Sequence, residues 1–216
     1  MAFLGVLMLQ TRFPRPPGDV GHPASWRIPV RHVVVQGASP QRVVVEQDEA
    51  LLAPFVDAAR ALVAEGARAI TTSCGFLVAF QQALQAALPV PVWTSSLLLL
   101  PALPQPGVLT VDGDSLGARH LQAAGAAPGT PVEGLAAGCH LQDTLLHDRP
   151  VLDRAAAEAD VVTAALRLVQ RHPQVRTLVL ECTNMPPYAA AVQAATGRPV
   201  HHLMSMVHAR WDALPR

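Results

Sequence analysis

The feature that most restricts how this chain can fold is a pair of cysteines at the ends of two similar segments. The segments are RAITTSCGF at Arg68–Phe76 and RTLVLECTN at Arg176–Asn184. Each begins with Arg, continues with residues typical of a buried parallel strand, and reaches Cys followed by a small residue. Open α/β sheets bind ligands at the carboxyl ends of their strands. Cys74 and Cys182 are therefore predicted to lie where a ligand binds.

The spacing of the two cysteines predicts two lobes. They are 108 residues apart, half of the 216 residues of the chain. Strand and helix patterns also alternate, which is typical of parallel sheets covered by helices. We expect an α/β fold of two similar lobes with parallel sheets, facing each other across a cleft. Lobe one is predicted at residues 1–93 and lobe two at 94–200, with a last helix in 201–216 returning to lobe one.

The periodicity of apolar residues predicts the elements in detail. The predicted strands are 3–9, 30–36, 42–46, 67–72, 89–92, 107–111, 131–135, 177–181 and 199–201. The predicted helices are 48–65, 76–87, 114–123, 151–170, 186–196 and 204–211, with a helical turn at 93–100 and a loop or short helix at 138–143.

Composition excludes several classes of protein. The formal net charge is +0, which argues against a nucleic-acid-binding protein. All 16 basic residues are Arg, so the chain lacks the Lys that pyridoxal phosphate enzymes, Schiff-base aldolases and P-loops require. The three cysteines form no zinc-binding motif, and no metal or cofactor is predicted.

The chain is predicted to be a soluble cytoplasmic protein. The apolar start, MAFLGVLMLQ, lacks the basic region and the cleavage site of a signal peptide and is interpreted as a first buried strand. The run Leu97–Leu100 is too short and too closely flanked by prolines to cross a membrane. Unpaired cysteines favour a reducing compartment.

A loop rich in Pro and Gly, Thr11–Pro23, follows the first predicted strand. These residues give a stiff, shaped segment on the ligand side of the sheet. Asp19 and His22 are its polar candidates. A surface turn in which Asp19 binds its own backbone is an equal alternative.

Two thiols in one cleft can move protons at carbon. Each cysteine precedes a predicted helix, whose free N–H groups and dipole stabilise a thiolate, so both thiols are expected to ionise readily. One thiolate can remove a proton from a carbon acid while the opposite thiol returns one to the other face, which inverts a stereocentre. The N–H groups after each Cys would hold the substrate carboxylate and the developing enolate.

Other reactive side chains are less informative. A single Cys at a strand end is more often a small buried apolar residue. Two cysteines at the same place in two similar segments favour a functional role. Cys139 has no matching partner and is assigned to structure. His140 and the pair His201–His202 could line the cleft, but single histidines of this kind are more often structural.

The segments TTSCGFLVAFQ and LECTNMPPY resemble the aspartate/glutamate/hydantoin racemase superfamily over the whole chain. The resemblance implies two flavodoxin-like (Rossmann-like) lobes related by a pseudo-twofold axis, no cofactor, a small carboxylate substrate and a homodimer. It implies that Cys74 and Cys182 are the acid/base pair. The expected substrate-binding residues are Gln10, Asp19, Thr72, Ser73, Gly75, Phe76, Thr183 and Asn184.

Within this superfamily the CGF motif, the ECT–PPY motif and the loop Arg15–Asp19 look similar to the dimethylsulfoniopropionate lyases of algae. Other relatives decarboxylate arylmalonates or isomerise maleate. The sequence departs from the amino-acid racemases at Gln10, where many of them have an acid. It departs from the glutamate racemases at Asn184, where they have His.

Three functions follow from these observations. The first is a racemase or epimerase that acts on a small carboxylate or an amino acid through both thiols. The second is a lyase of the same superfamily, with one Cys as base and the other as acid or positioning group. The third is a binder of small carboxylates without activity.

Overall fold

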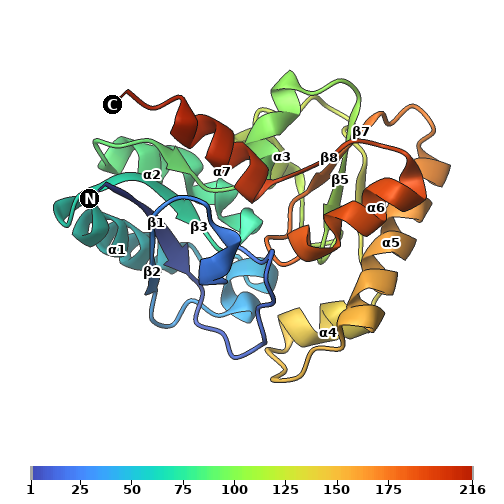
Figure 1. Cartoon of the computed structure of the whole chain (residues 1–216), viewed down its shortest axis with the longest axis horizontal. Helices are drawn as coiled ribbons and strands as arrows, with labels where there is room; N and C mark the ends of the chain where they lie inside the picture. The colour runs from blue at the N-terminus through green and yellow to red at the C-terminus, as the bar shows by residue number, and fades with distance from the viewer. Residues whose placement is uncertain (1, 216) are drawn as a thin grey trace.

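The computed structural model describes residues 2–215, so residues 1 and 216, the outer limits of the predicted lobes, lie outside it. Two four-stranded parallel sheets form the frame, in the orders β2-β1-β3-β4 and β6-β5-β7-β8. The sheets lie side by side with helices around them (Figure 1). The strands are β1 Phe3–Met8, β2 Val30–Val34, β3 Ala67–Thr72, β4 Val92–Trp93, β5 Pro106–Thr110, β6 Val132–Gly134, β7 Thr177–Leu180 and β8 Val200–His202.

Seven α-helices are found in the described residues: α1 Leu52–Ala64, α2 Gln81–Ala87, α3 Ala118–Ala123, α4 His140–Leu146, α5 Arg154–Arg171, α6 Ala189–Thr196 and α7 Leu203–Asp212. The 3-10 helices η4 (Gly75–Phe80), η5 (Ser96–Ala102) and η6 (Pro186–Tyr188) matter for the site. No helix of residues 2–215 is long and apolar enough to cross a membrane.

The two sheets repeat one topology, which confirms the predicted two-lobed α/β fold. In each, the first strand in sequence is central, and the third strand, which leads to a cysteine, lies beside it. Thus β1 and β3 in one lobe correspond to β5 and β7 in the other. The boundary at residue 93 stays a prediction.

Strand β1 shows how the sequence builds this core. All six of its residues are buried, and they alternate between two apolar clusters. Phe3 and Leu7 face the cluster that contains α1, whereas Leu4 and Val6 face residues of α7. A strand covered on both faces needs apolar residues at every position, which explains the continuous apolar run.

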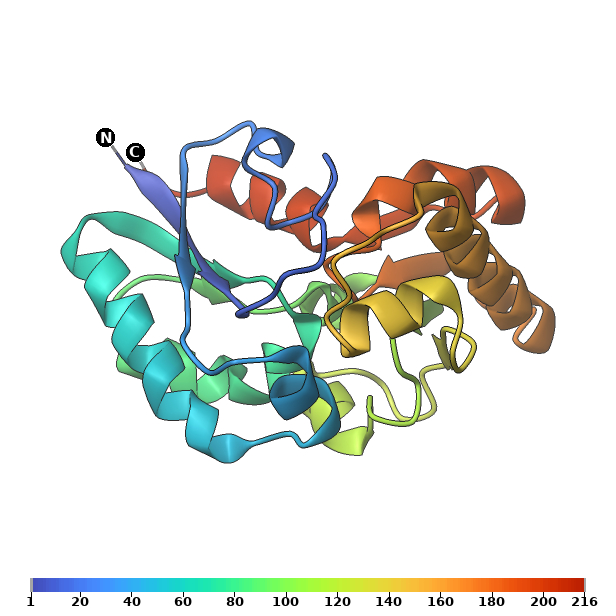
Figure 2. The same cartoon turned by 90° about the horizontal axis from the view of Figure 1, so that it is seen from below.

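The C-terminal helix α7 packs against the first sheet, although it follows the last strand of the second sheet. Its residues Leu203, Met206 and Val207 are buried in the cluster with Leu4 and Val6 of β1. Figures 1 and 2 both show the two chain ends close together beside the first sheet.

One predicted element is wrong. Residues 42–46 were expected to form a strand because of their Val run, but Gln41–Val45 form one turn of π-helix. Val43 donates its N–H to the Ser39 carbonyl, and its side chain and that of Val44 enter the core. Burial of these side chains thus overrides the β-propensity of Val.

Candidate active site

The two cysteines lie where the carboxyl ends of β3 and β7 approach each other. Cys74 follows β3 and caps η4, and Cys182 follows β7. Both are buried free thiols. One pocket is lined by both. Its other lining residues are Leu9, Phe13, Pro40, Val44, Ser73, Gly75, Phe76, Val111, Leu145, Leu146, Glu181, Thr183 and Asn184.

The residues beside each cysteine hold the two lobes together in a reciprocal manner. The Thr183 hydroxyl donates to the Ser73 carbonyl over 2.6 Å, so the residue after the second Cys binds the residue before the first. On the other side, Gly75 packs against Glu181. A Cβ at position 75 would meet the Glu181 carbonyl at 2.4 Å and would clash with Glu181 Oε1 as well. Glycine at position 75 is therefore required by close packing.

Ser73 and Glu181 occupy equivalent places and bind the neighbouring central strand in each lobe. The Ser73 hydroxyl accepts from the Leu9 N–H at 2.9 Å, just beyond β1. The Thr110 hydroxyl, at the end of β5, donates to Glu181 Oε2 at 2.7 Å. The site is thus symmetric in its fold, but a neutral hydroxyl stands on one side and a carboxyl group on the other.

Glu181 is the buried acid of the site. Its side chain is fully buried, and Oε1 has no hydrogen-bond partner in the structure. Loss of water around the carboxylate raises the pKa of Glu181 to about 8, although the hydrogen bond from Thr110 opposes this. Glu181 was predicted only as the last residue of a strand. The available signal was an acidic residue at the end of an otherwise apolar strand.

The expectation that both thiols ionise readily is wrong. The backbone N–H groups of Phe76 and Leu77 do lower the pKa of Cys74, and the N–H of Asn184 lowers that of Cys182. Burial, and then the charge of Glu181, act in the opposite direction and are stronger, so both thiol pKa values lie above the usual range.

The two thiols differ in their electrostatic surroundings. Arg15 attracts a thiolate at Cys74, which also has two backbone N–H groups. Asp19 and the Cys74 thiol repel a thiolate at Cys182, and only one backbone N–H group, that of Asn184, favours it. Cys74 is accordingly the thiol with more groups that favour ionisation.

The loop 11–23 folds back to the second cysteine. Asp19 is buried, and its carboxylate accepts from Arg15 Nη1 at 2.9 Å, from the Gly21 N–H at 2.7 Å and from Asn184 Nδ2 at 2.6 Å. Asn184 in turn accepts from the Cys182 thiol at 3.7 Å. Asp19 therefore reaches Cys182 through Asn184 and does not line the pocket itself.

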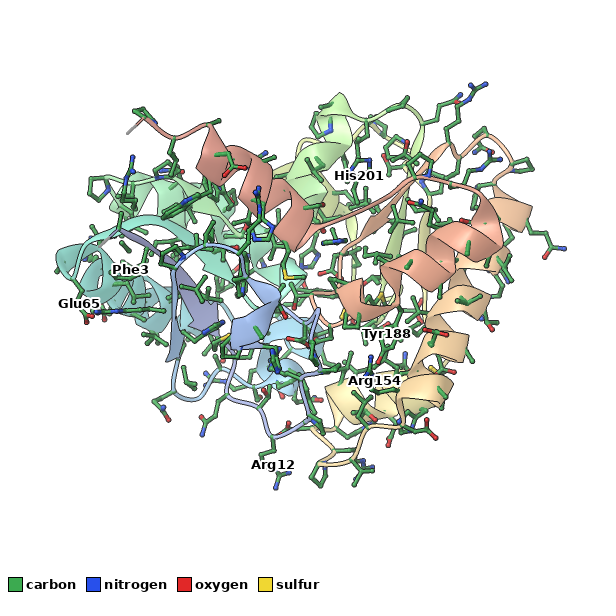
Figure 3. The ribbon with its side chains drawn as sticks, viewed as in Figure 1. Phe3, Arg12, Glu65, Arg154, Tyr188 and His201 are labelled. Atoms are coloured by element: carbon green, nitrogen blue, oxygen red, sulfur yellow. The ribbon has the colours of Figure 1, made fainter. Side chains whose placement is uncertain are left out.

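The same loop is fixed to the second lobe near the pocket mouth. The backbone N–H groups of Arg12 and Phe13 donate to Asp148 Oδ1 at 2.6 Å and 3.1 Å. Figure 3 shows Arg12 at the edge of the molecule, next to the connection between α4 and α5. These bonds hold the ring of Phe13 in the pocket lining beside Leu145 and Leu146.

Three of the predicted substrate-binding residues lie outside the pocket lining: Asp19, Gln10 and Thr72. Gln10 is exposed, and its side-chain oxygen accepts from the Gly37 N–H at 2.9 Å. The Thr72 hydroxyl donates to the Thr94 carbonyl at 2.7 Å, which joins β3 to the segment after β4. These contacts occupy the side-chain oxygen of Gln10 and the hydroxyl of Thr72.

The other candidate side chains are also placed elsewhere. Cys139 caps α4 and His140 accepts from the Asp153 N–H at 2.8 Å. His202 caps α7, accepting from the Ser205 N–H at 3.3 Å. Neither these residues nor His201 line the pocket. In residues 2–215, no group of three His, Cys, Asp or Glu is placed to hold a metal ion.

Comparison with curated proteins gives the family. A dimethylsulfoniopropionate lyase from Durusdinium sp. clade D is 31% identical over 93% of this chain and 71% of its own length. The chain belongs to the family of the dimethylsulfoniopropionate lyases. Dimethylsulfoniopropionate lyase 7 from Emiliania huxleyi is 30% identical over 91% of this chain, but over only 62% of its own length. No family profile matches the chain.

Solved structures of an arylmalonate decarboxylase and of a glutamate racemase have the same fold as this chain. Unliganded arylmalonate decarboxylase matches 99% of this chain and 91% of its own with a TM-score of 0.63 at 18% identity. A glutamate racemase from Bacillus anthracis matches 98% of this chain and 82% of its own with a TM-score of 0.58 at 15% identity. At such identities the likeness shows the fold, as the CGF and ECT–PPY segments led us to expect.

Proposed function

We propose that this protein is a carbon-acid lyase, which removes the α-proton of a small carboxylate and eliminates a leaving group from the β-carbon. The lyase names of its relatives favour elimination over racemisation, which was the first expectation from the sequence. The substrate in those names, dimethylsulfoniopropionate, has a carboxylate at one end and a sulfonium cation at the other.

The observation that carries this proposal is the composition of the pocket lining. Both thiols line it, but none of the described lining residues is Arg, Lys or His. A dicarboxylate substrate such as aspartate or glutamate would place a second negative charge there without a partner. A sulfonium group is an apolar cation, and it suits the aromatic and aliphatic side chains of Phe13, Phe76 and Leu145.

The charge of the substrate also affects the thiols. Burial raises the pKa values of Cys74 and Cys182 and favours the neutral thiols. A sulfonium cation beside a thiol favours the thiolate, whereas a second carboxylate opposes it. Binding of the cationic substrate would therefore help to produce the base that the reaction needs.

Cys74 is the better candidate for the base, because Arg15 and two backbone N–H groups favour its thiolate. The Cys74 thiolate takes the α-proton, the C–H electrons form the double bond to the β-carbon, and the bond from the β-carbon to sulfur breaks. Dimethyl sulfide leaves with that electron pair, acrylate remains, and Cys74 later returns its proton to solvent. Cys182 stays a thiol and positions the substrate.

The test is the release of dimethyl sulfide and acrylate from dimethylsulfoniopropionate, measured by gas chromatography and NMR. We expect equal amounts of both, with loss of activity in Cys74→Ser. Cys139→Ser is the matched control, because that thiol lies outside the pocket lining and should be dispensable. Wild-type protein that releases neither product would contradict the proposal.

Racemisation remains a second candidate because of one observation: two free thiols from two similar lobes line one pocket. A two-base racemase would incorporate solvent deuterium at the α-carbon of both enantiomers of its substrate. It would lose this exchange equally in Cys74→Ser and Cys182→Ser.

A further inference from the structure

Glu181 is a buried acid that the reaction described above does not use. It stands directly before Cys182 and lines the pocket with both thiols. Oε2 accepts from the Thr110 hydroxyl, but Oε1 is buried and has no hydrogen-bond partner among residues 2–215. A buried polar atom without a partner is costly, so its persistence at a pocket points to a partner that arrives with the ligand.

The position of Oε1 indicates which part of a ligand it meets. It lies against the Cα of Gly75, at the start of the backbone segment whose next two N–H groups point at the Cys74 thiol. A carboxylate held by such N–H groups, with its α-carbon between the thiols, would bring an oxygen next to Glu181. The apolar side chains of Phe13 and Leu145 would then surround the other end of the substrate.

We propose that Glu181 acts as a neutral carboxylic acid, whose Oε1–H donates a hydrogen bond to the carboxylate of the substrate and to the enolate that forms from it. This role rests on the proposed function, which supplies the carboxylate, and adds a residue that touches the reacting group. An ionised Glu181 would instead repel both the substrate carboxylate and the thiolate.

The surroundings of Glu181 are consistent with the neutral form. The titratable groups that face it are the two thiols, and neither supplies a positive charge. Arg15, whose charge acts on Cys74, forms an ion pair with Asp19. Burial raises the pKa of Glu181 to about 8, so the acid holds its proton at neutral pH. Preorganised donors of this kind stabilise developing negative charge most effectively in a dry site.

Substitutions separate this role from the alternatives. Glu181→Gln keeps a donor of the same shape, and we expect kcat to fall by less than about tenfold. Glu181→Leu keeps the volume but removes the donor, and we expect a loss of about 100-fold to 1,000-fold, the effect of deleting one oxyanion donor. Equal losses in both variants would indicate an ionised carboxylate, and full activity in Glu181→Leu would indicate a structural role. Either result would overturn the proposal.

The pH profile gives a sharper test with Thr110→Val as its matched variant. Activity of the wild type should decline above about pH 8 as Glu181 loses its proton. The Thr110 hydroxyl lowers the pKa of Glu181, so Thr110→Val should move this decline to higher pH. Glu181→Gln should abolish it. An unchanged decline in Glu181→Gln would contradict the inference.

Infrared spectroscopy detects the protonation state of the carboxyl group directly, in the wild-type protein and without any reaction. The wild-type protein should show the carbonyl band of a protonated carboxyl group near pH 7, and propionate should shift that band by accepting its hydrogen bond. If the band appears and shifts with propionate but the protein does not cleave dimethylsulfoniopropionate, the neutral Glu181 is supported and the proposed lyase function is refuted. If the protein cleaves dimethylsulfoniopropionate but shows no such band, only the proposed role of Glu181 is refuted.

Discussion

The two cysteine segments of this protein have the same fold but different chemistry. Each follows the third strand of a four-stranded sheet, and each is bound through the preceding residue to the central strand. The preceding residue is neutral Ser73 in one and acidic Glu181 in the other. A symmetric frame thus carries an asymmetric site, which suits a reaction in which the two thiols have different roles.

The residues after the cysteines extend this difference. Gly75 allows the backbone to approach Glu181, whereas Thr183 uses its hydroxyl to bind the Ser73 carbonyl. Asn184 connects Cys182 to the buried pair of Asp19 and Arg15, and Phe76, in the matching place after Cys74, is apolar. Repetition of the lobe therefore sets the positions of the thiols, and the flanking side chains decide what each thiol does.

The largest effect should come from the thiols themselves. We expect Cys74→Ser to reduce kcat/KM for dimethylsulfoniopropionate by about 1,000-fold or more, because a general base is lost. Cys182→Ser should cost about 10-fold to 100-fold, because a hydroxyl can still position the substrate. Steady-state kinetics measures both; equal losses would remove the asymmetry between the segments.

Gly75→Ala should be the next most harmful change. The added methyl group would overlap the carbonyl and the carboxyl group of Glu181 and force the two segments apart. We expect activity to fall by about 100-fold, as small misplacements at a reacting centre do. Overpacking should also cost about 1–3 kcal/mol in the free energy of unfolding. Gly117→Ala, where a Cβ would meet open space, is the control.

Asp19→Ala should destabilise the fold more than it alters the chemistry. The change leaves Arg15, whose side chain is 12% exposed, and Asn184 without their shared partner. Removing one member of a buried pair costs about 3–5 kcal/mol in the free energy of unfolding. Urea denaturation measures it. Glu65→Gln breaks an exposed pair with Arg31 and should leave stability unchanged; a similar loss there would contradict the account.

The last prediction concerns the pH dependence that Glu181 adds to stability. Its pKa is raised from 4.5 to about 8 in the folded state, so between these values the folded protein holds a proton that the unfolded chain has lost. Stability should therefore fall as pH rises through this window, by about 1.4 kcal/mol per pH unit. The buried histidines have lowered pKa values and make stability rise with pH. Their contribution is the same in the wild type and in Glu181→Gln.

The difference between wild type and Glu181→Gln therefore isolates this contribution. Urea denaturation at several pH values below about 8 gives it, before the cysteines of the unfolded chain begin to ionise. If stability changes with pH in the same way in the two proteins, Glu181 has an ordinary pKa and is an ionised carboxylate beside the thiols at neutral pH.

The sequence was sufficient for the frame of the molecule and for the position of its site. Apolar runs that end in Cys predicted β3 and β7, because strands buried on both faces leave a clear pattern. The expectation that Cys74 and Cys182 share one cleft rested on their places at strand ends, on the spacing of half a chain between them and on the family resemblance. The homodimer and the cytoplasmic location remain predictions.

What the sequence could not provide were balances between opposing effects. Burial raises the pKa of Cys74 and the backbone N–H groups lower it. Which effect is stronger depends on the three-dimensional structure. Gln10 was expected at the ligand because many relatives have an acid at this place, and the sequence could not show that its side-chain oxygen accepts from the Gly37 N–H. Glu181 was overlooked because the strand pattern located Cys182 but did not show that the side chain of Glu181 lines the same pocket.

The most direct test of the account is the fate of dimethylsulfoniopropionate in deuterated water, followed by NMR beside a panel of amino acids in both enantiomers. We expect acrylate and dimethyl sulfide to appear in equal amounts, with Cys139→Ser active and Cys74→Ser inactive, and no change in the amino acids. Deuterium at the α-carbon of an amino acid with growth of its opposite enantiomer, and no acrylate, would contradict the account and identify a racemase.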